Sequence, residues 1–148
     1  MMLYRLDVSP TSPTLPLYLE RISAGFPSPA ADYMDEGINL VKHLISHPSA
    51  TYVLRVSGES MRDAGILDDS LLLVDTSLQA GHHDIVVACL NGEFTVKRLA
   101  LRPTPHLRAE NPDYPPIFLN DEDDTRIVGV VTTVINTFRR VCARQSAS

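Results

Sequence analysis

Short runs of alternating apolar and polar residues dominate the chain from Thr51 onward. Alternation of this kind places side chains on opposite faces of a strand, so it predicts β-structure. Turn signals such as Asn91-Gly92 and Pro115-Pro116 separate the runs. Many short strands with few helices indicate a mostly-β domain, built as a folded sheet or barrel-like body. The predicted strands cover residues 52–56, 71–75, 85–90, 94–101, 106–109, 117–119 and 127–138.

Residues 1–31 have a different pattern, with prolines at positions 10, 13, 16, 27 and 29. Proline fixes φ and removes an N–H donor, so this stretch resists both helix and central strand. We therefore expect an extended N-terminal arm over residues 1–31, with a weak strand near 15–19, followed by a β-rich domain over 32–148.

One helix is expected at the start of that domain. Asp32 can cap it, and apolar residues follow near helical spacing at Met34, Ile38, Val41 and Ile45. His43 and His47 lie four residues apart, but Pro48 ends the segment and no third ligand accompanies them. We interpret both as surface histidines, and we expect neither a metal nor a cofactor.

Composition narrows the class of protein. A chain of 148 residues suits one domain, and its net charge of −5 argues against strong direct binding to nucleic acid. The basic cluster at residues 139–144 is a local exception. Cys89 and Cys142 lack metal-type spacing and indicate no disulfide framework. Without a signal-like start or a membrane-length apolar run, the expected location is the cytoplasm.

The candidate chemistry begins at Ser57-Gly58-Glu59-Ser60-Met61, directly after a predicted strand. A serine at such a turn can project its hydroxyl outward while neighbouring backbone N–H groups face the same space. In the strand at 94–101, alternation places Thr95, Lys97 and Leu99 on one face. A lysine desolvated there would have a lowered pKa and could accept the proton of a serine hydroxyl.

Each pattern also has a plainer interpretation, as a simple turn or as an exposed lysine beside Arg98. A rival catalytic arrangement would join Ser60 to His82-His83-Asp84 as a Ser–His–Asp triad. Adjacent residues on a strand point apart, however, whereas a triad needs the carboxylate to orient the histidine. The lysine-based interpretation is therefore preferred.

Taken together, Ser57-Gly58-Glu59-Ser60-Met61 and Phe94-Thr95-Val96-Lys97-Arg98-Leu99 resemble the serine–lysine self-cleaving proteins of the LexA/UmuD type. The stretch at 24–33 is similar to the cleavage region of the UmuD branch, and the resemblance extends from about Gly25 to Phe138. It implies the LexA/UmuD catalytic fold, with Ser60 as nucleophile and Lys97 as general base. It further implies an oxyanion hole from the backbone N–H groups of Ser60 and Glu59, and a scissile bond between Ala24 and Gly25.

The resemblance also implies partners. Full-length and trimmed forms would be homodimers, and a RecA–single-stranded DNA filament would stimulate cleavage. The trimmed dimer would serve a UmuC-type translesion DNA polymerase in the SOS response. A non-cleaving UmuD-like binding module is the main alternative. A LexA-type repressor would need a DNA-binding domain before the cleavage site, and the 24 residues before Gly25 are too few for one. A leader peptidase would need a membrane anchor, and the sequence shows no apolar run of that length.

Two turn positions depart from the family pattern. His83 and Asp69 stand where relatives usually have glycine, the residue that permits positive φ without strain. The geometry of these turns, at His83 and at Asp69-Ser70, is the open question that they raise.

Overall fold

The computed structural model of the 148-residue chain describes residues 3–5, 13–17, 24–25 and 37–139. The chain divides into two units, one formed by residues 1–6 and 49–148 and the other by residues 7–48. The larger unit contains the predicted strands.

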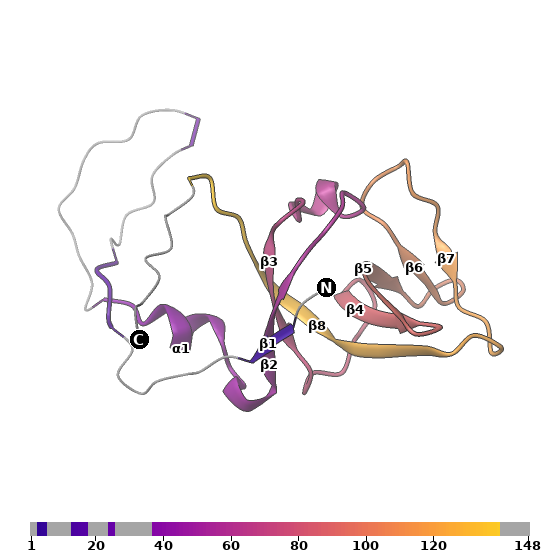
Figure 1. Cartoon of the computed structure of the whole chain (residues 1–148), viewed down its shortest axis with the longest axis horizontal. Helices are drawn as coiled ribbons and strands as arrows, with labels where there is room; N and C mark the ends of the chain where they lie inside the picture. The colour runs from indigo at the N-terminus through magenta and orange to yellow at the C-terminus, as the bar shows by residue number, and fades with distance from the viewer. Residues whose placement is uncertain (1–2, 6–12, 18–23, 26–36, 140–148) are drawn as a thin grey trace. The chain divides into compact units, whose positions relative to one another are not determined.

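Within the described residues, the larger unit forms one antiparallel sheet in the order β1-β2-β3-β8-β4-β5-β6-β7 (Figure 1). The mostly-β prediction is confirmed, and each predicted strand corresponds to one of β2 to β8. Strand β1 has no counterpart among the predictions. The strands are β1 Leu3–Arg5, β2 Thr51–Arg55, β3 Leu71–Asp75, β4 Ile85–Leu90, β5 Glu93–Ala100, β6 His106–Arg108, β7 Ile117–Phe118 and β8 Thr125–Ile135.

Strand β8 joins the two halves of the sheet. Its C-terminal half pairs with β3, from Val130 to Ile135, and its N-terminal half pairs with β4, from Thr125 to Val130. Both pairings are interrupted by a register shift, which increases local twist and lets the sheet fold over. Figure 1 shows β8 running between these two groups of strands.

The close approach of β3 and β8 requires a glycine. A Cβ atom added at Gly129 would lie 2.7 Å from Cγ1 of Val74 and 3.1 Å from the carbonyl oxygen of Asp75. Gly129 therefore sets how tightly the two halves pack against each other.

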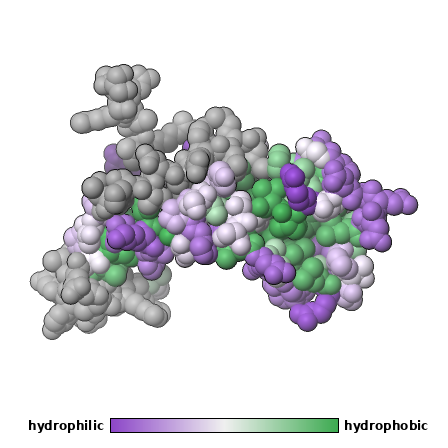
Figure 2. All heavy atoms as spheres, turned by 90° about the horizontal axis from the view of Figure 1, so that it is seen from below, coloured by the Kyte–Doolittle hydropathy of each residue, from purple (hydrophilic) through white to green (hydrophobic). Residues whose placement is uncertain are grey.

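Two apolar clusters form the core of this unit. The larger contains Leu54 and Leu72, both fully buried, and the smaller contains Val86 and Leu107. Burial of each such side chain contributes roughly 1.5–3 kcal/mol to folding. Some large apolar side chains remain exposed, among them Phe94, and Figure 2 shows apolar atoms reaching the surface on one face.

Left-handed backbone geometry occurs at the predicted Asn91-Gly92 turn and at the two turns whose geometry the sequence left open. Asn91 has φ 48° and Gly92 has φ 85°, which gives the β4–β5 hairpin the two positive values that a type I′ turn needs. His83 and Asp69 have φ 74° and 70°, so both turns adopt the conformation that glycine would favour. A side chain in this region costs about 1–2 kcal/mol relative to a right-handed conformation.

The smaller unit differs from the helix prediction. Helix α1 covers only Leu40–Leu44 and is capped by Asn39, whose side chain accepts a hydrogen bond from the Lys42 amide at 3.2 Å. The prediction placed the start at Asp32, which lies outside the described residues together with Met34. Gly37, with φ 106°, is incompatible with helix, and Ile38 instead forms a β-bridge with Leu15. This bridge is the described remnant of the weak strand expected near 15–19.

Two short 3₁₀ helices complete the secondary structure of the described residues: η1 Pro48–Ala50 precedes β2, and η2 Arg62–Ala64 follows the Ser60 turn. Among these residues, no helix combines the length and apolarity needed to cross a bilayer.

Candidate active site

Ser60 lies in the turn that connects β2 to η2. The next residue, Met61, is 2% exposed and belongs to the larger core cluster. Its carbonyl oxygen accepts hydrogen bonds from the amides of Ala64 and Ile66, at 3.1 and 3.2 Å. A buried side chain on one side of Ser60 and a hydrogen-bonded turn beyond it therefore fix the position of the hydroxyl.

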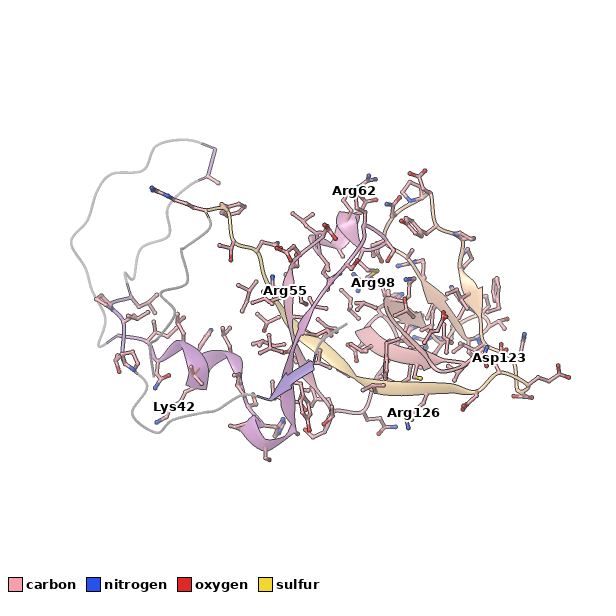
Figure 3. The ribbon with its side chains drawn as sticks, in the orientation of Figure 1. Lys42, Arg55, Arg62, Arg98, Asp123 and Arg126 are labelled. Carbon is pink, nitrogen blue, oxygen red and sulfur yellow. The ribbon has the colours of Figure 1, made fainter. Side chains whose placement is uncertain are left out.

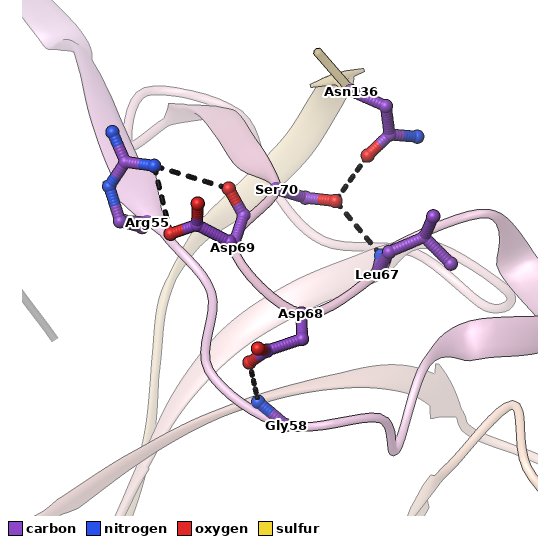
Figure 4. A network of polar contacts seen from close by, with 7 residues as sticks. All are labelled: Arg55, Gly58, Leu67, Asp68, Asp69, Ser70 and Asn136. Carbon is purple, nitrogen blue, oxygen red and sulfur yellow. Dashed lines mark hydrogen bonds and ion pairs between the residues drawn. The ribbon is translucent and has the colours of Figure 1, made fainter. Parts of the chain in front are cut away.

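The side chains of Asp68 and Asn111 bind the backbone of the two residues before Ser60. Gly58 has φ 95°, and its amide donates to Oδ1 of Asp68 at 2.8 Å (Figure 4). Asn111, only 5% exposed, donates from Nδ2 to the Glu59 carbonyl oxygen at 2.9 Å. The carbonyl is thereby directed toward Asn111, which constrains the peptide plane between Glu59 and Ser60.

The loop that returns to β3 is also hydrogen-bonded on both sides. Arg55 contacts Oδ1 of Asp69 at 3.0 Å, and Ser70 Oγ accepts from the Leu67 amide at 2.9 Å while donating to Asn136 on the far side (Figure 4). The exposed Arg55–Asp69 pair contributes little to stability, whereas the buried Ser70 ties the loop to the segment after β8.

Lys97, on β5, is 8% exposed and points to Ser60. Its Nζ lies 3.1 Å from Ser60 Oγ, 2.7 Å from Thr95 Oγ1 and 3.2 Å from the Val96 carbonyl oxygen. Burial lowers the pKa of the Lys97 ammonium below its usual value of 10.5. No carboxylate of the described residues forms an ion pair with Lys97, so nothing charged there offsets this desolvation.

The three oxygen atoms around Nζ suit a neutral amine. A neutral lysine has two N–H donors and one lone pair. Thr95 Oγ1 and the Val96 carbonyl oxygen can accept the two N–H bonds, which leaves the lone pair for the hydroxyl proton of Ser60. The arrangement can therefore accept a proton from Ser60 without moving heavy atoms.

A groove of about 570 Å³ opens beside Ser60. One part of its wall is formed by the turn after β2 and another by the start of β5. Phe94, 52% exposed, offers an apolar surface to anything that binds there. The lining residues are Arg55, Val56, Ser57, Ser60, Met61, Asp68, Asp69, Phe94, Thr95 and Val96.

The rival triad is not assembled. The Leu101 amide donates to Nδ1 of His82 at 2.9 Å, and the Asp84 carboxylate accepts from the Gly81 amide at 2.8 Å. Neither group hydrogen-bonds to Ser60. Within the part of the chain that the structure describes, no three His, Cys, Asp or Glu side chains are placed to hold a metal ion.

Three charged side chains, Arg98 on β5, Arg108 on β6 and Glu110 after it, form a cluster beside the strand that carries Lys97. Arg98, labelled on β5 in Figure 3, donates to Glu110 at 2.5 Å and to the His83 carbonyl oxygen at 2.6 Å. Burial opposes ionisation of Glu110, but hydrogen bonds from Arg98 and Arg108 outweigh it and lower the pKa of the carboxyl group. The Glu110 carbonyl oxygen also accepts a hydrogen bond from the Asp63 amide at 2.8 Å, so this cluster is connected to η2.

Sequence reasoning predicted Ser60 and Lys97, and the structure brings them together. Sequence reasoning did not identify Asn111 or Asp68 as residues that hold the Ser60 turn. Asn111 lies 52 residues from its partner Glu59, and Asp68 lies 10 residues from its partner Gly58. No local pattern indicates such contacts. The predicted cleavage residues Ala24 and Gly25 are exposed and form a bend in the smaller unit.

Comparison with known proteins gives consistent matches over most of the chain. The Peptidase S24-like family matches residues 16–132. Protein MucA of Salmonella typhimurium is 54% identical over 120 residues, which cover 80% of this chain and 82% of MucA. Protein ImpA of the same species is 45% identical over 128 residues, or 85% of this chain and 86% of ImpA. LexA repressor 1 of Pseudomonas syringae pv. tomato is 40% identical over 123 residues, or 82% of this chain and 60% of the repressor.

Proposed function

The chain belongs to the Peptidase S24-like family, in its LexA/UmuD group, and on this premise we propose that it cleaves its own backbone between Ala24 and Gly25. The observation that carries the proposal is the buried Lys97 amine 3.1 Å from Ser60 Oγ, with no described carboxylate paired to it. Burial lowers the pKa of this lysine, which suits it to act as a general base.

The first half of the reaction forms an acyl-enzyme. Lys97 Nζ takes the hydroxyl proton while Ser60 Oγ attacks the carbonyl carbon of Ala24. The negative charge that develops on the Ala24 oxygen would be held by the backbone N–H groups of Ser60 and Glu59. Among the hydrogen bonds of the described residues, none uses either amide, which supports their availability for this role.

The second half releases both products. The C–N bond breaks as the proton on Lys97 passes to the leaving nitrogen of Gly25. Water then attacks the Ala24–Ser60 ester while Lys97 accepts one of its protons, and Lys97 passes that proton to Ser60 Oγ as the ester bond breaks, which regenerates both residues. The products are one chain ending in the Ala24 carboxylate and one beginning with the Gly25 amine.

The substrate bond is part of the same protein, so its effective concentration is high whether the bond comes from the same chain or from a dimer partner. A groove with few specific pockets can then suffice, which fits a protein that is cut once. Ala24 and Gly25 are small, and an exposed Ala-Gly bond obstructs the approach of Ser60 least.

The biological role proposed on this basis is that of a UmuD-type protein in SOS mutagenesis. The similarity to MucA and ImpA supports it. A homodimer would be trimmed in the cytoplasm when a RecA–single-stranded DNA filament stimulates cleavage, and the trimmed dimer would serve a UmuC-type polymerase. The alternative, a UmuD-like module that binds without cutting, is disfavoured because both Ser60 and Lys97 are present.

Intact mass after incubation with activated RecA, or alone at alkaline pH, tests the proposal. Wild-type protein should yield fragments that end at Ala24 and begin at Gly25, and Ser60→Ala and Lys97→Ala should yield none. Both variants should keep the circular dichroism spectrum of the wild type. A junction elsewhere would refute the site, and an active Lys97→Ala protein would refute the base.

A further inference from the structure

The connection between two neighbouring strands contains the bond that the proposed function cuts. Strand β1 pairs antiparallel with β2 through Leu3↔Leu54, Tyr4↔Val53 and Arg5↔Tyr52. The segment from residue 6 to residue 50 links the two strands, and Ala24–Gly25 lies within it. A cut at this bond would place β1 and β2 on separate chains.

This pairing depends on the covalent connection. Three paired residues exchange only a few backbone hydrogen bonds, and each contributes modestly to stability because water competes for the same groups. In the intact chain the covalent link between β1 and β2 raises the effective concentration of β1 at the β2 edge. After a cut, the same contacts would have to offset the translational and rotational entropy that two separate molecules lose when they associate. The fragment that carries β1 would therefore dissociate.

Loss of β1 would leave β2 with one open edge, because its other edge is paired to β3. The β2 sequence Thr-Tyr-Val-Leu-Arg has no proline, no lysine and no charge before Arg55. Proteins usually protect exposed edges with such residues, and β2 has none in its interior. The opposite edge of the sheet differs, because β7 is two residues long and follows Pro115-Pro116.

We propose that β1 is a displaceable occupant of the β2 edge and that cleavage frees this edge to accept an extended segment of a partner protein by strand addition. The inference rests on the proposed self-cleavage. The chemistry of the partner segment follows from the strand now seated there, Leu3-Tyr4-Arg5. It would be extended, antiparallel to β2 and free of proline, with an aliphatic and an aromatic residue followed by a basic one.

The test separates the edge from the self-cleavage reaction. A full-length Ser60→Ala chain receives the recognition sequence of an unrelated site-specific protease in place of residues 26–31, so that the linker can be cut without Ser60. The probe is a fluorescent peptide of residues 1–8. After the cut and gel filtration, we expect the peptide to bind at least tenfold more tightly than to the uncut chain. A peptide carrying Tyr4→Pro, which lacks the strand amide, should not bind.

Amide hydrogen exchange reports the edge directly. Exchange of those amides among residues 52–54 that face β1 should become at least tenfold faster after the cut and should slow again when the peptide is added. Full-length Tyr4→Pro protein should show the faster exchange without any cut.

A disulfide lock provides the matched control. Tyr4 and Val53 are directly opposite in the register, and such pairs lie about 4.5–5.5 Å apart, within disulfide range. In a Cys89→Ser, Cys142→Ser background, the oxidised Tyr4→Cys/Val53→Cys chain should bind no peptide after the cut. Reduction should restore binding.

Three results would overturn the inference: equal peptide binding before and after the cut, unchanged exchange at 52–54, or a fragment that stays bound through gel filtration. Disulfide cross-linking of two cut Val53→Cys chains through β2 would overturn it as well, because a second copy would then be the occupant. If wild-type protein never cuts itself but the protease-cut chain binds the peptide, the self-cleavage proposal fails and the edge assignment stands.

Discussion

Lys97 Nζ lies 2.7 Å from Thr95 Oγ1, closer than its 3.1 Å distance to Ser60 Oγ. The two residues stand on the same face of β5, two positions apart. Thr95 therefore holds Lys97 Nζ beside Ser60, and in the proposed mechanism it is a positioning residue that directs the lone pair of the neutral amine toward the Ser60 hydroxyl.

Thr95→Val should slow self-cleavage about tenfold, which corresponds to about 1.4 kcal/mol in the barrier. Valine keeps the shape of threonine but removes the oxygen that accepts from Lys97. Thr95→Ser retains that oxygen and should restore most of the rate. Single-turnover cleavage at fixed pH measures both, and equal rates for valine and serine would contradict the positioning role.

The rate of unstimulated self-cleavage should rise with pH. Only the neutral amine of Lys97 accepts a proton, so well below its pKa the rate should increase about tenfold per pH unit. Because burial lowers the pKa of Lys97 below 10.5, the rate should level off before that pH. A rate that does not change between pH 7 and pH 10 would point away from lysine as the base.

The free energy of unfolding should also depend on pH through the lowered pKa of Lys97. The pKa of Lys97 is lower in the folded than in the unfolded state, so the unfolded state binds more protons between the two values. The free energy of unfolding should therefore rise with pH across that window, relative to Lys97→Met, which lacks the titrating group. Urea unfolding of Ser60→Ala protein with and without Lys97→Met, at pH 7 and pH 10, measures the difference while excluding self-cleavage. An advantage of methionine that is equal at both pH values would contradict the burial argument.

His83→Gly should stabilise the protein by about 0.5–1 kcal/mol. His83 has φ 74°, and glycine would relieve the strain of this conformation, partly offset by the greater entropy of the unfolded chain. His83→Ala loses the same ring but keeps the strain, so it should give no gain. Thermal unfolding of both variants measures the two changes in stability. An alanine variant as stable as the glycine variant would contradict the strain argument.

Gly129→Ala should destabilise the protein by about 1–3 kcal/mol, because the added methyl group would press on Val74 and on the backbone of Asp75. Gly81→Ala is the matched control. A Cβ there has its nearest neighbour at 3.6 Å, so the change should stay within about 0.5 kcal/mol. Chemical unfolding with both variants tests whether close approach, rather than glycine itself, is what β8 requires.

Most of the sheet could be predicted because alternation reports a half-buried strand locally. Strands β3 and β4 occupy the predicted residues, and the other predictions differ at the ends by a few positions. Ser60 and Lys97 could be proposed because each lies in a short motif. The contact of Asn111 with Glu59 could not, since it joins segments 52 residues apart with no shared pattern.

Strand β1 escaped prediction for a related reason. Three residues are too few to show a period, and the pairing partner lies beyond a proline-rich segment. The helix prediction failed because it followed apolar spacing through Gly37, whose positive φ interrupts the helix and leaves Asn39 as the cap.

The place of β8 in the sheet has a consequence for synthesis on the ribosome. Ser60 follows β2 and Lys97 stands on β5, and among the described strands the two halves of the sheet are joined through β8, whose residues are synthesised after both. A nascent chain can form the β4–β5 hairpin early, but the β3–β8 and β4–β8 pairings that join the two halves of the sheet form only after β8 has emerged from the exit tunnel. On the proposed mechanism, the order of the strands would therefore delay completion of the sheet around Ser60 and Lys97 until β8 is made, and so would protect a shorter nascent polypeptide from cutting itself.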